Sequence, residues 1–300
     1  MTVARFVDAA GVTLHARIDG QGPPVVLLHG FTGSGRSLAR LARGLRDAYT
    51  TIRIDLVGHG LSAAPAEGAA YRMPRCVEQL AAAMDALGVS DAHLLGYSMG
   101  GRTALALCAD RPERVRSALL IGASAGIEDA AERAARVRAD EELADRIEGD
   151  GIPAFVDAWM AQPLFATQRR LNPAARDEAR DERLANHPAA LAASLRGMGS
   201  GAQPPLHARL AEFARPVRLV VGELDEKFRR IAADLAGRLP DARVEVVSGA
   251  GHAVHVENPE AVLQIARRCF AESETRTLRR AFRPPRAPES EREEGSPWNR

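Results

Sequence analysis

The chain has 300 residues, with 40 lysines and arginines against 39 aspartates and glutamates, and a formal net charge of +1. This near balance provides no overall field that would attract nucleic acid or an anionic membrane surface, and we expect neither as a partner. The length is sufficient for one large α/β domain with an insertion.

Cysteine usage and hydropathy exclude several further classes. The three cysteines Cys76, Cys108 and Cys269 are odd in number and widely spaced, which is not the pattern of a disulfide framework. No metal-ligand spacing is visible, and we expect no cofactor. No apolar run approaches the ~20 residues of a membrane span, and the N-terminus has no charged region followed by an apolar one. We therefore expect a cytoplasmic enzyme with a small-molecule substrate; the sequence carries no signal of an oligomeric state.

Short apolar runs alternate with helical patterns along most of the chain. This alternation predicts an α/β fold with a mostly parallel, doubly wound sheet. The predicted strands are residues 25–28, 51–54, 93–95, 117–121, 217–221 and 244–247.

The pattern changes between the fourth and fifth of these strands. Residues 127–200 are rich in Ala, Arg, Glu and Leu at helical spacing and have almost no strand signal. We interpret 124–205 as a helical cap inserted over the carboxyl edge of a sheet formed by 1–123 and 206–272. Residues 273–300 alternate Arg, Glu, Pro and Ser, which predicts a disordered charged tail.

A glycine-rich loop follows the first predicted strand, in His29-Gly-Phe31-Thr-Gly-Ser-Gly35. Such a loop can donate the Phe31 amide to an oxyanion hole. Phosphate binding is the alternative for a glycine-rich loop, but neither Gly-x-Gly-x-x-Gly nor a Walker lysine is present. Asp55 follows the second strand, and we interpret it as a structural brace of the nucleophile turn.

Ser98 lies within Gly96-Tyr-Ser-Met-Gly100, directly after an apolar run and directly before a helical stretch. This is the setting of a nucleophile elbow, in which small neighbours allow the chain to pack closely around a strained serine. The amide of Met99 would lie at a helix N-terminus, where unsatisfied N–H groups favour developing negative charge. A glycine and serine turn without chemistry has the same letters, so the motif needs support from the rest of the chain.

That support comes from an acid and a base in the expected order. Asp225 follows the strand 217–221, and His252 follows the strand 244–247. A serine needs a base, and the base needs a carboxylate to orient it. The order Ser98, Asp225, His252 is that of α/β-hydrolases. His255 is the competing histidine, but its position within the following stretch favours a supporting role.

Arginines are placed where carboxylates could be bound. Arg102 lies one helical turn after Ser98, and the cap contributes Arg136 and Arg183. Each of these could instead extend into solvent, as most arginines on amphipathic helices do. If several converge on one cavity, their guanidinium groups would bind a substrate with more than one carboxylate.

Seven segments together resemble the 2-succinyl-6-hydroxy-2,4-cyclohexadiene-1-carboxylate synthases of menaquinone biosynthesis, which are α/β-hydrolase-fold lyases. The resemblance covers residues 23–268 and includes the cap. The segments are His29-Gly-Phe-Thr-Gly-Ser34, Gly96-Tyr-Ser-Met-Gly-Gly-Arg102, Glu132-Arg-Ala-Ala-Arg136, Trp159 with Gln162-Pro-Leu-Phe165, Ser194-Leu-Arg-Gly-Met-Gly-Ser200, Gly222-Glu-Leu-Asp-Glu-Lys-Phe228 and Gly249-Ala-Gly-His-Ala-Val-His-Val-Glu-Asn-Pro259.

The resemblance implies a lyase that eliminates pyruvate from a tricarboxylate, 2-succinyl-5-enolpyruvyl-6-hydroxy-3-cyclohexene-1-carboxylate. Ser98, activated by His252 and Asp225, would act as a base, and the Phe31 and Met99 amides would hold an enolate oxygen. The residues that match the family's substrate-binding positions are Arg102, Arg136, Arg183, Tyr97 and Trp159.

Three points stay open on the residues alone. Arg180 lies one turn from Arg183 and could take its role, and Lys227 has no chemical role that we can assign beyond a local brace. A serine ester or C–C bond hydrolase would use the same triad, although an apolar ester pocket would leave buried guanidinium groups unpaired. A non-catalytic ligand-binding protein on the same fold is the third alternative.

Overall fold

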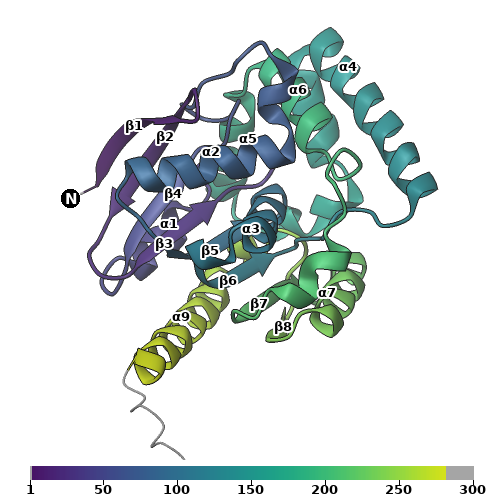
Figure 1. Cartoon of the computed structure of the whole chain (residues 1–300). Helices are drawn as coiled ribbons and strands as arrows, with labels where there is room; N and C mark the ends of the chain where they lie inside the picture. Colours follow the sequence, from purple (N-terminus) through teal and green to yellow (C-terminus); the bar gives the residue numbers. More distant parts are fainter. Residues whose placement is uncertain (1, 282–300) are drawn as a thin grey trace, which may run out of the picture.

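The computed structural model describes residues 2–281 and contains an eight-stranded sheet of order β1-β2-β4-β3-β5-β6-β7-β8 (Figure 1). All neighbouring pairs from β4 to β8 are parallel, which confirms the mostly parallel α/β-hydrolase sheet. The strands are β1 Val3–Ala9, β2 Val12–Asp19, β3 Pro24–Leu28, β4 Thr50–Ile54, β5 Ala92–Tyr97, β6 Val115–Ile121, β7 Val217–Gly222 and β8 Ala242–Val247.

The antiparallel strands β1 and β2 are absent from the six strands predicted above. They form a hairpin whose turn consists of Ala10 (φ 56°) and Gly11 (φ 85°). Positive φ at both central residues matches the twist of the flanking strands. Most of β1 is exposed at the edge of the sheet, so this strand lacks the continuous apolar run that marks the others.

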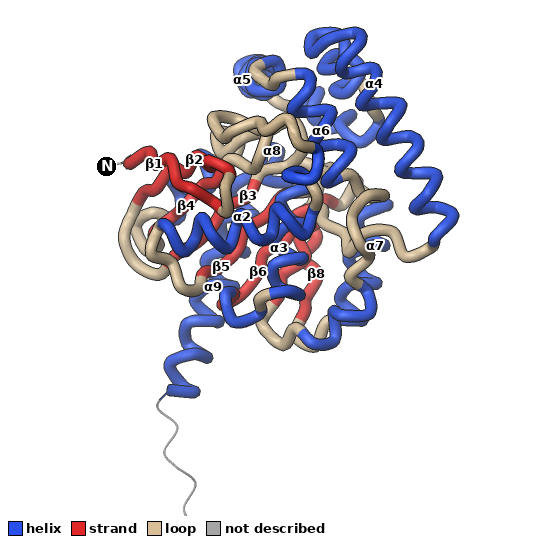
Figure 2. Tube along the Cα trace, turned by 45° about the horizontal axis from the view of Figure 1, so that its top comes forward, coloured by secondary structure: helices blue, strands red, loops and turns tan. Residues whose placement is uncertain are grey.

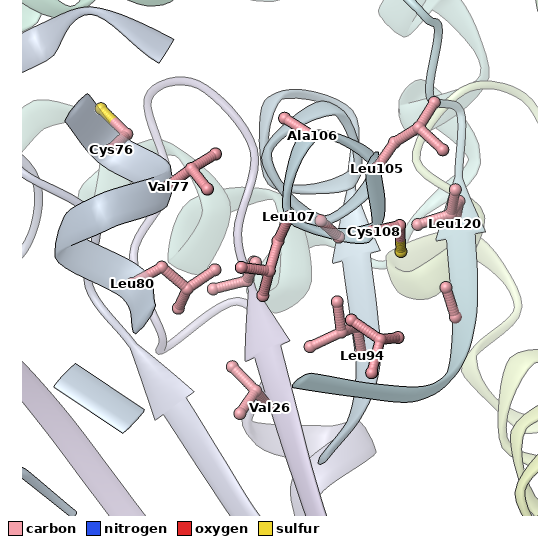
Figure 3. Packing of buried hydrophobic residues seen from close by; sticks show 14 of the residues in the cluster. Val26, Cys76, Val77, Leu80, Leu94, Leu105, Ala106, Leu107, Cys108 and Leu120 are labelled. Carbon is pink, nitrogen blue, oxygen red and sulfur yellow. The ribbon is translucent and has the colours of Figure 1, made fainter. Parts of the chain in front are cut away.

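The central strands are buried on both faces, because helices cover both sides of the sheet. Val26 and Leu28 of β3 belong to one core, and Val25 and Leu27 belong to the other. In Figure 3 Val26 and Leu94 lie beneath side chains of α2 and α3, such as Leu80 and Leu107. The first core is covered by α2 (Met73–Ala86), α3 (Met99–Asp110) and α7 (Glu226–Arg238), and the second by α1 (Ala39–Leu45), α8 (Val254–Glu257) and α9 (Pro259–Ala281).

Helices are inserted between β6 and β7 and lie above the sheet (Figure 2). They are α4 (Ala130–Met160), η3 (Pro163–Arg170), α5 (Pro173–Leu184) and α6 (Pro188–Met198), followed by the short 3-10 helix η4 (His207–Glu212) just before β7. Two further 3-10 helices, η1 (Gly68–Tyr71) and η2 (Pro112–Arg114), lie before β6. Gly151, with φ 80°, and the nearby Pro153 kink α4. The inserted helical cap is confirmed, while its boundaries at 124 and 205 stay our interpretation. No helix within residues 2–281 combines the length and the apolar composition needed to cross a bilayer.

The predicted start of the disordered tail is wrong. Helix α9 continues to Ala281, and Glu274 holds it against the sheet through His93 Nε2 at 2.9 Å and Arg116 Nη1 at 3.0 Å. Glu274 thus has a buried partner on β5 and a partly buried partner on β6, and composition alone cannot show such contacts. The rest of the predicted tail, 282–300, lies outside the described residues.

Three buried histidines are held in neutral form by their surroundings. Burial lowers the pKa of His93 to about 4, and it lowers the pKa values of His59 and His255 to about 3. His93 lies within β5. Its Nδ1 is 2.8 Å from Ser117 Oγ, and its ring stacks on the Phe270 ring at a centroid distance of 4.6 Å.

These histidines should make the fold acid-sensitive. Their folded pKa values lie below the unfolded value of about 6.5, so only the unfolded chain takes up these protons as the pH falls below 6.5. The contribution of these neutral histidines to the free energy of unfolding is complete above pH 6.5 and is lost progressively as the pH falls towards 4. At pH 5 the loss is about 2 kcal/mol per histidine. Urea unfolding at pH 7 and pH 5 measures this loss. The exposed His187→Gln variant should show the same loss, and pH-independent stability would contradict the prediction.

Candidate active site

The site lies where the order of the sheet reverses. The chain passes from β3 to β4 on one side and then returns to β5 on the other side of β3. The loops after β3 and β5 therefore diverge and leave a crevice at the carboxyl ends of the strands, where ligands bind in open α/β sheets. The glycine-rich loop follows β3, and Ser98 follows β5.

Ser98 occupies a sharp turn between the last residue of β5 and the first residue of α3. Its backbone has φ 50° and ψ −108°, a conformation that is strained for a residue with a Cβ. Two glycines make the turn feasible: a Cβ on Gly96 would lie 2.5 Å from the Gly100 carbonyl oxygen, and a Cβ on Gly100 would overlap the carbonyl oxygen of Leu28. The sequence motif thus reflects a requirement for close backbone packing.

His252 joins Ser98 to Asp225. Its Nε2 lies 3.2 Å from Ser98 Oγ, and its Nδ1 lies 2.8 Å from Asp225 Oδ2. Asp225 and His252 are both buried, and Asp225 Oδ1 also accepts a hydrogen bond from the Phe228 amide at the start of α7. Since a carboxylate can only accept, Nδ1 carries the proton and Nε2 is free to receive one from the serine.

The residue after β6 must be small to make room for this histidine. Gly122 has φ 56°, and a Cβ there would lie 2.7 Å from His252 Cε1. Three consecutive parallel strands, β6, β7 and β8, therefore position the histidine through the residues that follow them.

The two predicted oxyanion donors come from opposite sides of the crevice. Met99 is the first residue of α3, where an amide has no partner within the helix. Phe31 lies in the loop after β3, and its ring contacts the Trp159 ring of the cap at a centroid distance of 5.5 Å. Both residues line the same cavity.

That cavity has a volume of about 590 Å³ and lies between the sheet and the cap. A larger groove of about 1160 Å³ lies beside η1 and α6, but none of the predicted site residues lines it. Eight of the ten predicted site residues line the smaller cavity: Phe31, Tyr97, Ser98, Met99, Arg102, Arg136, Trp159 and His252.

Arg102 is a largely buried cation with neutral partners. Its guanidinium donates to Gln203 Oε1 at 2.7 Å and to the Met198 carbonyl at 2.6 Å. Among the described residues no carboxylate lies within ion-pairing distance of it. Burial, with the nearby charge of Arg136, lowers the pKa of Arg102 to about 10, against the opposing charge of Asp140. A carboxylate from a ligand would provide a direct partner for this guanidinium.

Arg136 has a carboxylate partner that the sequence analysis missed. Its Nε donates to Asp140 Oδ1 at 2.7 Å. Burial raises the pKa of Asp140, against the opposing charge of Arg136. The spacing of four residues on one helix could have revealed this pair. Gln203, which holds Arg102, had no such signal.

Arg183 does not line the same cavity as the triad. It lines an adjoining cavity of about 330 Å³, and Tyr97 and Phe31 line both cavities and lie between them. Arg183 donates to the Ala179 carbonyl at 2.6 Å, while its buried Nε has no partner. Arg180 instead pairs with Asp157 at 2.8 Å and lines neither cavity.

The interpretation of Asp55 as a brace of the nucleophile turn is wrong. Asp55 accepts hydrogen bonds from the amides of Gly35 at 2.6 Å and Leu61 at 3.0 Å, and it lies 2.8 Å from His15 Nδ1. It therefore holds the loop after β3 rather than the turn at Ser98. Because β4 is the neighbour of β3 and is separated from β5, its carboxyl end cannot reach the elbow.

Two further residues lie beside the triad without joining it. The His255 ring packs on the Tyr97 ring at 4.0 Å. Lys227 is exposed and lines the cavity of about 590 Å³ that Ser98 and His252 also line. Its Nζ lies 6.0 Å from the Phe228 ring centre. In the part of the chain that the structure describes, no group of three or more His, Cys, Asp or Glu side chains is arranged to hold a metal ion.

Comparison with known proteins places this geometry in context. Residues 23–259 match the family model described as alpha/beta hydrolase fold. A Bacillus subtilis protein, provisionally named 2-succinyl-6-hydroxy-2,4-cyclohexadiene-1-carboxylate synthase, is 45% identical over 78% of this chain and 85% of its own length. The synthase of the same name from Enterobacter sp. is 34% identical over 80% of this chain and 88% of its own. The structure of MenH from S. aureus superposes with a TM-score of 0.83 at 29% identity, covering 86% of this chain and 98% of that one.

The elbow should not tolerate a methyl group. Gly100→Ala places a Cβ against the carbonyl oxygens of Leu28 and His29, so we expect a loss of about 3 kcal/mol in the free energy of unfolding. Gly237→Ala is the matched control, because that exposed helical glycine has open space around it and should gain up to about 1 kcal/mol. Denaturant unfolding measures both, and equal stability of the two variants would contradict the packing argument.

Proposed function

The chain belongs to the α/β-hydrolase fold family and, within it, to the 2-succinyl-6-hydroxy-2,4-cyclohexadiene-1-carboxylate synthases, and we propose that it catalyses their reaction. This reaction is the 2,5-elimination of pyruvate from 2-succinyl-5-enolpyruvyl-6-hydroxy-3-cyclohexene-1-carboxylate, a step of menaquinone biosynthesis. The protein is then a carbon–oxygen lyase. The observation that carries the proposal beyond the fold is that the partly buried Arg102 has no carboxylate directly bonded to it, because the substrate supplies carboxylates.

Ser98 takes the role of the base in this proposal. The triad draws the hydroxyl proton towards His252 Nε2, and the resulting oxygen removes the ring proton next to the succinyl ketone. Asp225 keeps the imidazole in the tautomer that can accept this proton and stabilises the imidazolium that forms.

The Phe31 and Met99 amides are assigned to the negative charge of the intermediate. Removal of the ring proton moves an electron pair onto the ketone oxygen, which becomes an enolate. Fixed N–H donors on either side of the crevice stabilise this oxygen without reorganising. As the enolate collapses, the ring double bond shifts and the C–O bond to the enolpyruvyl group breaks. The departing enolate of pyruvate takes up the proton that the triad has gained, which yields pyruvate and restores the triad.

Recognition of the substrate is assigned to the arginines and the aromatic residues around the cavity. Arg102 and Arg136 line the cavity of the triad, and Arg183 faces the adjoining cavity across Tyr97. Trp159 provides an apolar wall from the cap. Guanidinium groups bind carboxylates with two parallel hydrogen bonds, so each arginine can orient one carboxylate of the substrate.

We also assign the protein to the cytoplasm. The support for this is that Cys76, Cys108 and Cys269 are all buried and unpaired, as is usual in a reducing compartment.

The function is tested by following pyruvate release from freshly generated substrate, beside cleavage of a simple aryl ester. We expect rapid pyruvate release with little ester cleavage. Ester cleavage without pyruvate release would support a serine hydrolase instead, and the absence of both reactions would support a ligand-binding protein.

Ser98→Ala should lower kcat for pyruvate release by about 10³-fold, since the base is lost while the arginines that bind the substrate remain. Steady-state kinetics give kcat, and calorimetry gives the affinity for a tricarboxylate analogue, which should be unchanged. A variant that retains the wild-type rate would exclude Ser98 as the base.

Arg102→Gln should lower kcat/KM by about 10²-fold, because a charge-assisted pair with a substrate carboxylate is lost. Arg230→Gln is the control, since Arg230 is an exposed arginine that pairs with Glu226 on α7. An unchanged kcat/KM for Arg102→Gln would contradict its carboxylate-binding role.

A further inference from the structure

The loop after β3 is held from above by the cap as well as from below by the sheet. Its residues 31–37 carry the Phe31 amide, and they contact the cap at both backbone and side chains. We propose that Glu182, in the last turn of α5, and Asn186, two residues after the end of that helix, are positioning residues that set the geometry of the oxyanion hole. This inference rests on the proposed pyruvate elimination.

Glu182 reaches from the cap into the loop with a buried carboxylate. Its Oε1 accepts hydrogen bonds from Ser34 N at 2.9 Å, Ser34 Oγ at 2.6 Å and Ser37 N at 3.1 Å. Burying a carboxylate is costly unless hydrogen bonds compensate, and three donors from one loop provide that compensation. A displaced loop would leave the charge without partners, so this contact favours one loop position.

Asn186 holds the residue next to Phe31. Its Nδ2 donates to the Thr32 carbonyl at 2.8 Å and to the Arg183 carbonyl at 2.9 Å. Thr32 is buried and has φ 70°, a left-handed conformation that is strained for a β-branched residue. Such a conformation persists only where the surroundings impose it. Asn186 is the cap residue that bonds to the strained peptide.

The Phe31 side chain is fixed from the same direction. Its ring contacts the Phe155 and Trp159 rings of α4 at centroid distances of 6.3 and 5.5 Å. With Glu182 and Asn186 these contacts tie positions 31, 32, 34 and 37 to cap helices. The donors of an oxyanion hole must be placed to within about 0.5 Å to be effective. The cap therefore completes the catalytic site as well as covering it.

The same turn of α5 also serves the substrate side. Arg183 lies between Glu182 and Asn186 in sequence and faces the cavity beside Tyr97. The residue that lines this cavity and the two residues that hold the loop therefore belong to one short segment of the cap.

The test compares kcat and KM for pyruvate release in single and double variants. For Asn186→Ala we expect kcat to fall about 10-fold with KM within about twofold of wild type, because the amide acts on the transition state more than on the bound substrate. In a Thr32→Gly background the same change should have a smaller effect, because glycine adopts positive φ without strain. A purely structural role would not produce this dependence on residue 32.

A second pair of variants tests the carboxylate. Glu182→Ala should lower kcat about 10-fold, and Glu182→Gln, which retains an acceptor oxygen, should restore most of it. Asp177→Asn is the matched control, since this exposed carboxylate lies on the same helix and should have no effect. Thermal unfolding accompanies each measurement, so that rates are compared only among folded variants; if Glu182→Ala fails to fold, Asn186→Ala and the double variant decide.

The outcomes separate the two proposals. If the wild-type chain releases no pyruvate, the proposed function is wrong. If the wild type releases pyruvate but Asn186→Ala and Glu182→Ala retain its kcat, or change KM alone, the positioning role is wrong. Loss of kcat with rescue by Glu182→Gln and with coupling to Thr32→Gly supports it.

Discussion

The absence of side chains at two backbone crossings is the constraint on which the site depends. Gly96 and Gly100 allow β5, the loop after β3 and the first turn of α3 to approach closely enough to force Ser98 into its strained conformation. That conformation points the hydroxyl at His252 and leaves the Met99 amide at the start of a helix. A methyl group at either glycine would separate these elements, and Ser98 and the Met99 amide, the proposed base and oxyanion donor, would be displaced together.

The distribution of charge distinguishes this site from an ordinary ester pocket. Arg102 is partly buried and hydrogen-bonded to the neutral acceptors of Gln203 and Met198, whereas Arg136 is directly paired with Asp140. A desolvated guanidinium without a directly bonded carboxylate gains most when a carboxylate of a ligand binds to it. The fold could serve many reactions, but this electrostatic arrangement favours a substrate with several negative charges.

In the proposed mechanism the cap contributes to chemistry as well as to recognition. Its α4 helix supplies Trp159 and Arg136 to the cavity, and the end of α5 holds the backbone of the loop after β3. The contacts from the cap explain why the loop can contain the strained Thr32, because the Asn186 hydrogen bond to its carbonyl helps to maintain the conformation of this residue. Movement of the cap would alter both the arginines and the oxyanion donor.

The amino-acid sequence alone determined the parallel sheet, the inserted helices and the placement of Ser98, Asp225 and His252 at one edge. It could do so because these residues lie in the segments that follow three parallel strands, β5, β7 and β8, and parallel strands end at a common edge. Only the tertiary structure decided which arginines face which cavity, that Asp55 braces the β3 loop, and that α9 extends past residue 273. These features depend on how each helix is rotated and packed against the sheet. That packing is determined by contacts between residues far apart in the chain, such as Glu182 with Ser34.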